Sequence, residues 1–187
     1  MEYTLIRSDR KSLGMQIKGT EVIVRAPFSE PQSRIDAFVR ENAEWAERNL
    51  KKAEERQEKA DSLGPLTEEE RIGLTKIAKD YIPRRAELYA RVIGVKYNRI
   101  TVRCQKTKWG SCSSAGNLNF NCLLMLCPRE VIDSVVVHEL CHLKEMNHSR
   151  RFYREVLSAF PDYKKYHAWL KKNGGVLLER VKAGEEE

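Results

Sequence analysis

No apolar run in this 187-residue sequence approaches the roughly 20 residues that a membrane-spanning helix requires. Residues 1–5 lack the pattern of a secretory signal peptide. The five cysteines are an odd number without the spacing of a disulfide framework, and Cys122 and Cys127 have no second pair to complete a zinc knuckle. We therefore expect a cytoplasmic protein without a membrane segment, in which Cys122, Cys127 and Cys141 are reduced core residues.

Internal repeats and low-complexity segments are also missing. With 41% apolar and 33% charged residues, the chain can form one full core and a small appended lobe. The net charge of +7 is unevenly distributed: residues 41–70 carry ten acidic and five basic side chains, whereas residues 149–172 carry seven basic and two acidic ones. The basic segment could attract nucleic acid or an acidic protein, although solvated helix faces are the simpler interpretation.

The apolar run at residues 135–143 contains the pattern His-Glu-x-x-His. His138 and His142 are one helical turn apart, so both imidazoles can reach a single ion from the same face of a helix. Zinc favours nitrogen ligands, and catalytic zinc sites keep one coordination position open for water. Glu139 can stand beside that water as a general base. The sequence thus predicts a catalytic zinc site on a buried helix.

A catalytic zinc site needs a third protein ligand, and we expect His148 to supply it. His148 cannot share a helix face with His142, so the chain must turn between them. Asn147 is the predicted turning point, because asparagine tolerates the left-handed conformation that ends helices. Glu155 on the next helix is the alternative ligand, but imidazole is the commoner metal ligand.

The first part of the chain, residues 1–62, predicts a β-meander followed by a helix. Residues 3–8, 13–18 and 21–26 are rich in strand-forming side chains and are separated by glycine-containing turns. Ser29 can cap the helix that follows, and the charged segment up to Asp61 suits a solvent-exposed helix.

The sequence of the remaining chain predicts a catalytic domain at residues 63–175. Because both parts combine helices with strands, we expect the whole protein to be of the α+β class. Thr67 and Glu70 form a capping box for a helix that ends at Gly94. We expect a small antiparallel sheet beside the active-site helix, and a frayed C-terminal tail at residues 176–187. The predicted elements are strands at 99–104 and 117–121, the active-site helix from Pro128 to about Met146, and helices at 151–160 and 163–172 that end at Gly174-Gly175.

These residues resemble the YgjP-like zinc metallopeptidase family. The resemblance rests on Lys-Thr-Lys-Trp-Gly-Ser-Cys-Ser-Ser at 106–114, Gly-Asn-Leu-Asn-Phe-Asn at 116–121, the His-Glu-x-x-His motif, and Asn-His-Ser at 147–149. It extends over nearly the whole chain and departs mildly at Tyr153, where the family often has tryptophan. The resemblance implies a minimal zincin-like fold, distantly related to SprT-like proteases, and supports His148 as the third ligand.

The predicted function is zinc-dependent hydrolysis of a peptide or protein substrate. Zinc held by His138, His142 and His148 would activate a water molecule, and Glu139 would take its proton and pass it to the leaving amine. Tyr163, Tyr166 and His167 are candidate donors to the oxyanion. Asp133 could orient a ligand histidine but suits the first helical turns better, and Trp109 could line the cleft or seal the core.

The alternative function is a nucleic-acid-associated protein with a structural or vestigial metal site, or a protease acting on DNA-bound proteins. The basic segment motivates it, and it predicts weak, salt-sensitive nucleic-acid binding. Glu139 argues against a purely structural site, which normally uses four protein ligands. The sequence predicts neither the cleavage preference nor the oligomeric state.

Overall fold

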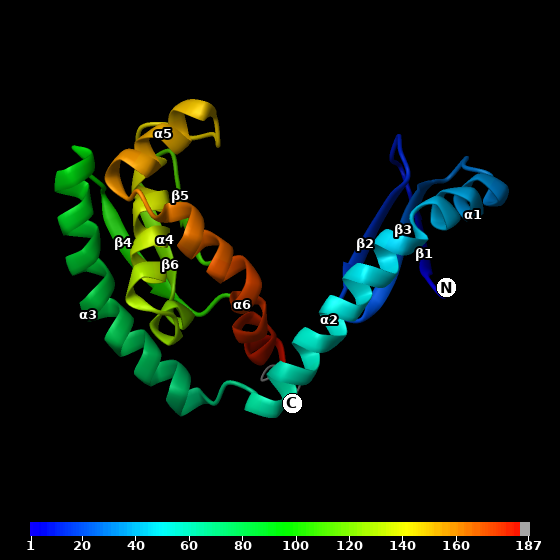
Figure 1. Cartoon of the computed structure of the whole chain (residues 1–187), viewed down its shortest axis with the longest axis horizontal. Coiled ribbons are helices and arrows are strands. Elements are labelled where there is room, and N and C mark those ends of the chain that lie inside the picture. The colour runs from blue at the N-terminus through cyan, green and yellow to red at the C-terminus, as the bar shows by residue number, and fades with distance from the viewer. Residues whose placement is uncertain (184–187) are drawn as a thin grey trace. The chain divides into compact units, whose positions relative to one another are not determined.

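The computed structural model describes residues 1–183, and its mixture of helices and small sheets confirms the α+β class (Figure 1). The chain folds into two compact units, one from Met1 to Leu63 and one from Gly64 onward. Within the described residues, no helix combines the length and the apolar composition that crossing a bilayer requires. Each unit has its own core.

The N-terminal unit contains β1 (Thr4–Ser8), β2 (Gly14–Lys18), β3 (Glu21–Pro27), α1 (Gln32–Glu41) and α2 (Ala43–Leu63). Its strand order is β1-β3-β2, with β1 parallel and β2 antiparallel to β3. The predicted meander is therefore wrong, because β3 and not β2 lies in the centre. The physical reason is burial: β3 is the most apolar strand, and Val24 and Ala26 pack with Ile35 and Val39 of α1.

The second unit begins with α3 (Glu68–Ile93), whose ends match the sequence prediction. Thr67 accepts a hydrogen bond from the backbone of Glu70, and the Glu70 carboxylate accepts one from the backbone of Thr67, so the capping box is confirmed. Gly94 ends the helix with φ 75°, a left-handed conformation that glycine adopts without strain.

The sheet of the second unit consists of β4 (Arg99–Arg103), β6 (Asn117–Asn121) and β5 (Gly110–Cys112), in that order. β5 is antiparallel to β6, but β4 is parallel to it, so the sheet is mixed rather than antiparallel as predicted. The short turn around Gly116 joins β5 and β6 as a hairpin. Because β5 occupies one edge of β6, β4 must pair with the other edge, where its direction is parallel.

Four helical segments complete this unit: η1 (Cys122–Leu126), α4 (Arg129–Cys141), α5 (Arg150–Ala159) and α6 (Tyr163–Ala183). α4 contacts both α3 and α6, and it lies between them in Figure 1. Its side chains at 131–137 are buried, and Cys122, Cys127 and Cys141 lie in the core as predicted. The candidate site is therefore on the most deeply buried helix of the unit.

α6 continues through Gly174-Gly175 to Ala183, so the predicted helix end and tail at 176 are wrong. A Cβ on Gly174 would lie 2.7 Å from Cζ2 of Trp109. The glycine thus permits close packing between helix and indole instead of ending the helix. Residues 184–187, the last part of the predicted tail, lie outside the described residues.

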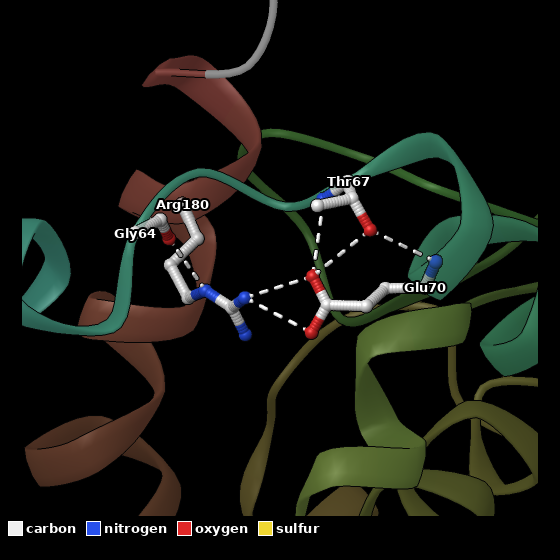
Figure 2. Close-up of polar contacts among 4 residues, drawn as sticks. All are labelled: Gly64, Thr67, Glu70 and Arg180. Carbon is white, nitrogen blue, oxygen red and sulfur yellow. Dashed lines mark hydrogen bonds and ion pairs between the residues drawn. The ribbon is translucent and has the colours of Figure 1, made fainter.

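The last turns of α6 are anchored to the start of α3 by Arg180 (Figure 2). The buried guanidinium donates from Nε to the Gly64 carbonyl at 2.8 Å and from Nη2 to both carboxylate oxygens of Glu70 at 3.0 and 3.1 Å. The backbone N–H of Leu66 donates to the Arg180 carbonyl at 3.0 Å. Glu70 therefore serves both the helix cap and this anchor.

Candidate metal centre

Three histidine side chains converge at the C-terminal end of α4. Nε2 of His138 lies 3.2 Å from Nε2 of His142 and 3.0 Å from Nε2 of His148. Zinc–nitrogen bonds of about 2.0–2.1 Å at a tetrahedral angle place ligand nitrogens about 3.3 Å apart. The three nitrogens are thus spaced to hold one ion, and they form a potential metal-binding group among the described residues.

His148 reaches this position by a route that differs from the prediction. α4 ends at Cys141 rather than near Met146, and the N–H groups of Lys144 and Glu145 both donate to the Cys141 carbonyl in a tight turn. Asn147 is not the left-handed turning point, since no described residue other than glycine has a positive φ. Ser149 then caps α5 by accepting from the Phe152 N–H at 3.3 Å.

Two of the histidines, His138 and His142, are oriented by hydrogen bonds in which their Nδ1 atoms take part. Nδ1 of His142 lies 3.1 Å from the carbonyl oxygen of Glu145, and a carbonyl can only accept. His142 therefore carries its proton on Nδ1 and presents the lone pair of Nε2 to the cluster. Phe152 is fully buried, with its ring centroid 4.5 to 4.9 Å from those of all three imidazoles. This ring restricts their positions by packing.

A chain of hydrogen bonds joins His138 to α6. Nδ1 of His138 lies 2.8 Å from the Tyr163 hydroxyl, which lies 3.2 Å from Nδ1 of His167. If Nε2 of His138 carries the lone pair, Nδ1–H donates to the Tyr163 oxygen, and the Tyr163 hydroxyl donates to His167. A neutral His167 then carries its proton on Nε2. Of the three predicted oxyanion donors, Tyr163 is already engaged and Tyr166 packs against Phe160 with ring centroids 5.8 Å apart, whereas the Nε2–H of His167 has no hydrogen-bond partner within residues 1–183.

Glu139 is buried against β5. Its side chain is 6% exposed, and a Cβ on Gly110 would lie 2.7 Å from its Oε1 and 2.8 Å from its Cγ. Only glycine at this strand position leaves space for the carboxyl group. Burial raises the pKa of Glu139 to about 8, although the nearby Lys108 acts in the opposite direction. The carboxyl group is therefore poised to exchange a proton near neutral pH.

His138 and His142 are held in the neutral form that metal binding requires. Burial lowers the pKa of His138 to about 3, and the neighbouring His142 and His148 add to this effect. Burial also lowers the pKa of His142, although the carbonyl of Glu145 opposes it. Neutral imidazole offers a lone pair at Nε2, so the electrostatics of the cluster match its geometry.

A pocket of about 180 Å³ opens beside Glu139 and His138. Tyr163, His167 and Leu170 of α6 form one side of it, and Lys108, Trp109 and Gly110 form the other. Trp109 both lines this pocket and packs on Gly174, so each of its two predicted roles is present. Glu139 and His167 thus line the same pocket.

Two other candidates lie outside the cluster. Asp133 accepts hydrogen bonds from Nε and Nη2 of Arg85 at 2.7 and 2.6 Å, so it ties α4 to α3 instead of orienting a histidine. The Glu155 carboxylate accepts from Lys144 Nζ at 2.8 Å and is not part of the histidine group. Sequence reasoning missed the roles of Gly110 and Phe152, and the resemblance at residues 106–114 is the only signal that points to the former.

Histidines converging at the end of a buried helix beside a buried carboxyl group are typical of metal-dependent hydrolases. The profile of the YgjP-like family, described as its metallopeptidase domain, matches residues 70–173, more than half of the chain. The chain therefore belongs to the YgjP-like metallopeptidase family, and the resemblance seen in the sequence is confirmed.

Two solved structures are also similar. They are the metallopeptidase zymogens abylysin from Pyrococcus abyssi and jannalysin from Methanocaldococcus jannaschii. Abylysin is 23% identical with a TM-score of 0.44, and the match covers 49% of this chain and 93% of abylysin. Jannalysin is 19% identical with a TM-score of 0.44, and the match covers 49% of this chain and 94% of jannalysin. No curated protein gives a significant match.

Proposed function

We propose that the protein is a zinc metallopeptidase of the His-Glu-x-x-His type, with His138, His142 and His148 as the metal ligands. The observation that carries this proposal is the convergence of the three Nε2 atoms, two of them oriented through Nδ1, beside a buried glutamate. Three nitrogen ligands leave a fourth coordination position for catalysis, whereas a structural zinc site normally has four protein ligands. When bound, zinc makes a water molecule more acidic and polarises the peptide carbonyl.

Glu139 is the proposed general base. Its carboxylate accepts a proton from the attacking water and delivers it to the nitrogen of the leaving amine. A pKa of about 8 makes Glu139 a stronger base than an exposed glutamate, and binding of a dication nearby favours its ionised form. Gly110 allows the carboxyl group to lie close against β5, because no side chain intervenes.

His167 is the proposed donor to the substrate carbonyl oxygen. It lines the same pocket as Glu139, and its Nδ1 is engaged by Tyr163. Its Nε2–H is thereby free to donate to the oxygen on which negative charge develops. Loss of one such donor typically lowers kcat by about a hundredfold to a thousandfold.

Metal analysis combined with peptide cleavage tests the proposal. We expect about one zinc ion per chain, retained in Glu139→Gln and lost in the His138→Ala/His142→Ala double variant. The glutamine variant should bind peptides but not cleave them, because an amide cannot accept the proton. Stoichiometric zinc in the double variant contradicts the ligand assignment, and full activity in the glutamine variant contradicts the mechanism.

A further inference from the structure

One face of α5 continues outward from the histidine cluster. Arg150, Tyr153, Arg154 and Leu157 recur at the spacing of neighbours on one side of a helix. Together with His148, Ser149 and Ser158, they line an open groove of about 650 Å³. Phe152 and Val156 on the opposite side of α5 are buried in the core, so the orientation of this face is fixed.

The groove is continuous with the metal centre. His148 belongs to both, and the Tyr153 ring centroid lies 6.2 Å from that of His148 and 6.4 Å from that of Tyr163. Tyr153 remains 40% exposed although it touches this aromatic cluster. A peptide that passes the histidines on this side therefore meets Tyr153 and the two arginines.

Two guanidinium groups at this face have no salt-bridge partner within the described part of the chain. The side chains of Arg150 and Arg154 form neither a hydrogen bond nor a salt bridge there, and Arg154 has only a longer-range attraction to the neighbouring Glu155. The adjacent acid, Glu155, is engaged by Lys144 at 2.8 Å. The rim of the groove is thus cationic, while Tyr153 and Leu157 supply apolar surface between the charges.

We propose that this groove is a specificity site that binds a glutamate of the peptide substrate, on the His148 side of the cleaved bond. This inference rests on the proposed peptidase function. Glutamate fits both features, because its methylene groups can lie on Tyr153 and Leu157 while its carboxylate bonds to a guanidinium. Arg150 and Arg154 are about 6 Å apart along the helix axis, which is close to two residues of an extended peptide. The site therefore accommodates acidic residues at alternate positions of the substrate.

The small number of cations and the apolar floor of the groove favour a peptide over a nucleic acid as the occupant. Two cations over an apolar floor are few for a phosphate backbone, whose binding proteins usually make many such contacts. The third arginine, Arg151, is exposed at another angle around the helix and does not line the groove. It therefore provides a matched control with the same charge change next to the site.

Binding by the zinc-loaded Glu139→Gln variant tests the inference without cleavage. Three fluorescein-labelled octapeptides would be titrated by fluorescence anisotropy. They are identical except that the tested positions carry glutamate, alanine or lysine. We expect glutamate peptides to bind about tenfold more tightly than lysine peptides, a preference that shrinks with added salt. Adding either Arg150→Glu or Arg154→Glu should weaken this preference and adding both should reverse it, whereas adding Arg151→Glu, with the same charge change as either single substitution, should leave it unchanged. Circular dichroism and zinc content would show that the charge-reversal variants remain folded.

Equal affinity for the three peptides, or an equal effect of Arg151→Glu, overturns the specificity site. A single-stranded oligonucleotide that binds more tightly than the glutamate peptide, through Arg150 and Arg154, overturns it in favour of nucleic acid. Cleavage of the same peptides by the zinc-loaded wild type is measured separately. Cleavage without a glutamate preference in binding supports the peptidase function and contradicts the specificity site. Glutamate-selective binding without cleavage supports the glutamate-binding groove and contradicts the peptidase function.

Discussion

The substitution Gly110→Ala probes how the position of Glu139, the proposed general base, is set. The new Cβ would lie 2.7 Å from Oε1, 2.8 Å from Cγ and 2.9 Å from Cδ of Glu139. Carbon atoms in contact normally lie about 3.5–4.0 Å apart, so the carboxyl group must move by roughly 1 Å. Since the whole end of the side chain is too close, a rotation of the carboxylate alone cannot relieve the overlap.

A displacement of roughly 1 Å in a catalytic group lowers the rate by about a hundredfold. Overpacking at a buried position also costs about 1–3 kcal/mol of folding free energy. Zinc affinity should remain at the wild-type level, because the inserted methyl group faces Glu139 and not an imidazole. The expected result is therefore a lower kcat with unchanged zinc content.

Steady-state kinetics, zinc analysis and thermal unfolding would be measured on the same preparations. Gly73→Ala is the matched control, because a Cβ there meets nothing within 4 Å and the glycine lies inside α3. It should keep wild-type activity and gain up to about 1 kcal/mol in stability from helix propensity. If Gly110→Ala cleaves peptides at the wild-type rate, Gly110 does not position Glu139 and the reasoning fails.

Three further predictions concern His148, the pKa of Glu139 and the Arg180 anchor. His148→Ala should weaken zinc binding far more than Glu155→Ala, because Glu155 is paired with Lys144 and lies outside the histidine group. Titration against a competing chelator measures the two zinc affinities. The reverse order would make Glu155 the ligand. In metal-free protein, the raised pKa of Glu139 means that the folded state binds an extra proton, so the contribution of Glu139 to stability falls as pH rises from 4.5 to about 8, while the lowered pKa of His138 acts in the opposite direction up to about pH 6.5. Glu139→Gln should remove this fall, which is at most about 5 kcal/mol, and unfolding with denaturant at pH 5 and pH 8 would detect it. Arg180→Ala should cost about 2 kcal/mol by leaving the Gly64 carbonyl without its donor, yet keep zinc affinity; an unchanged melting temperature would contradict the anchor.

The sequence predicts well those features that depend on neighbours along the chain. The spacing of His138 and His142 brings them to one side of α4, and the capping box of Thr67 is encoded within four residues. The grouping of His148 with them requires only that the chain turn within six residues. Each of these features depends on residues close in sequence, so helical geometry predicts the first two, while the third also needs a turn whose exact path was not predicted.

The errors concern contacts between distant segments. Alternation identifies a strand but not its neighbour, so the central positions of β3 and β6 could not be predicted from local pattern. Gly174 has the local pattern of a helix end, but its role depends on Trp109, which is far away in the sequence. Asp133 likewise depends on Arg85 of α3, and no local signal in α4 identifies that partner.

The hydrogen-bond chain from His138 through Tyr163 to His167 has a consequence for the order of synthesis. The three histidines emerge from the ribosome before Tyr163 and His167, which support the cluster from α6. α6 in turn is fixed at its far end by Arg180, which closes onto a segment made more than a hundred residues earlier. A nascent chain can therefore present all three histidines before it has the partners that orient them. We therefore expect the histidine cluster to reach its oriented form only when nearly the whole described chain has been translated.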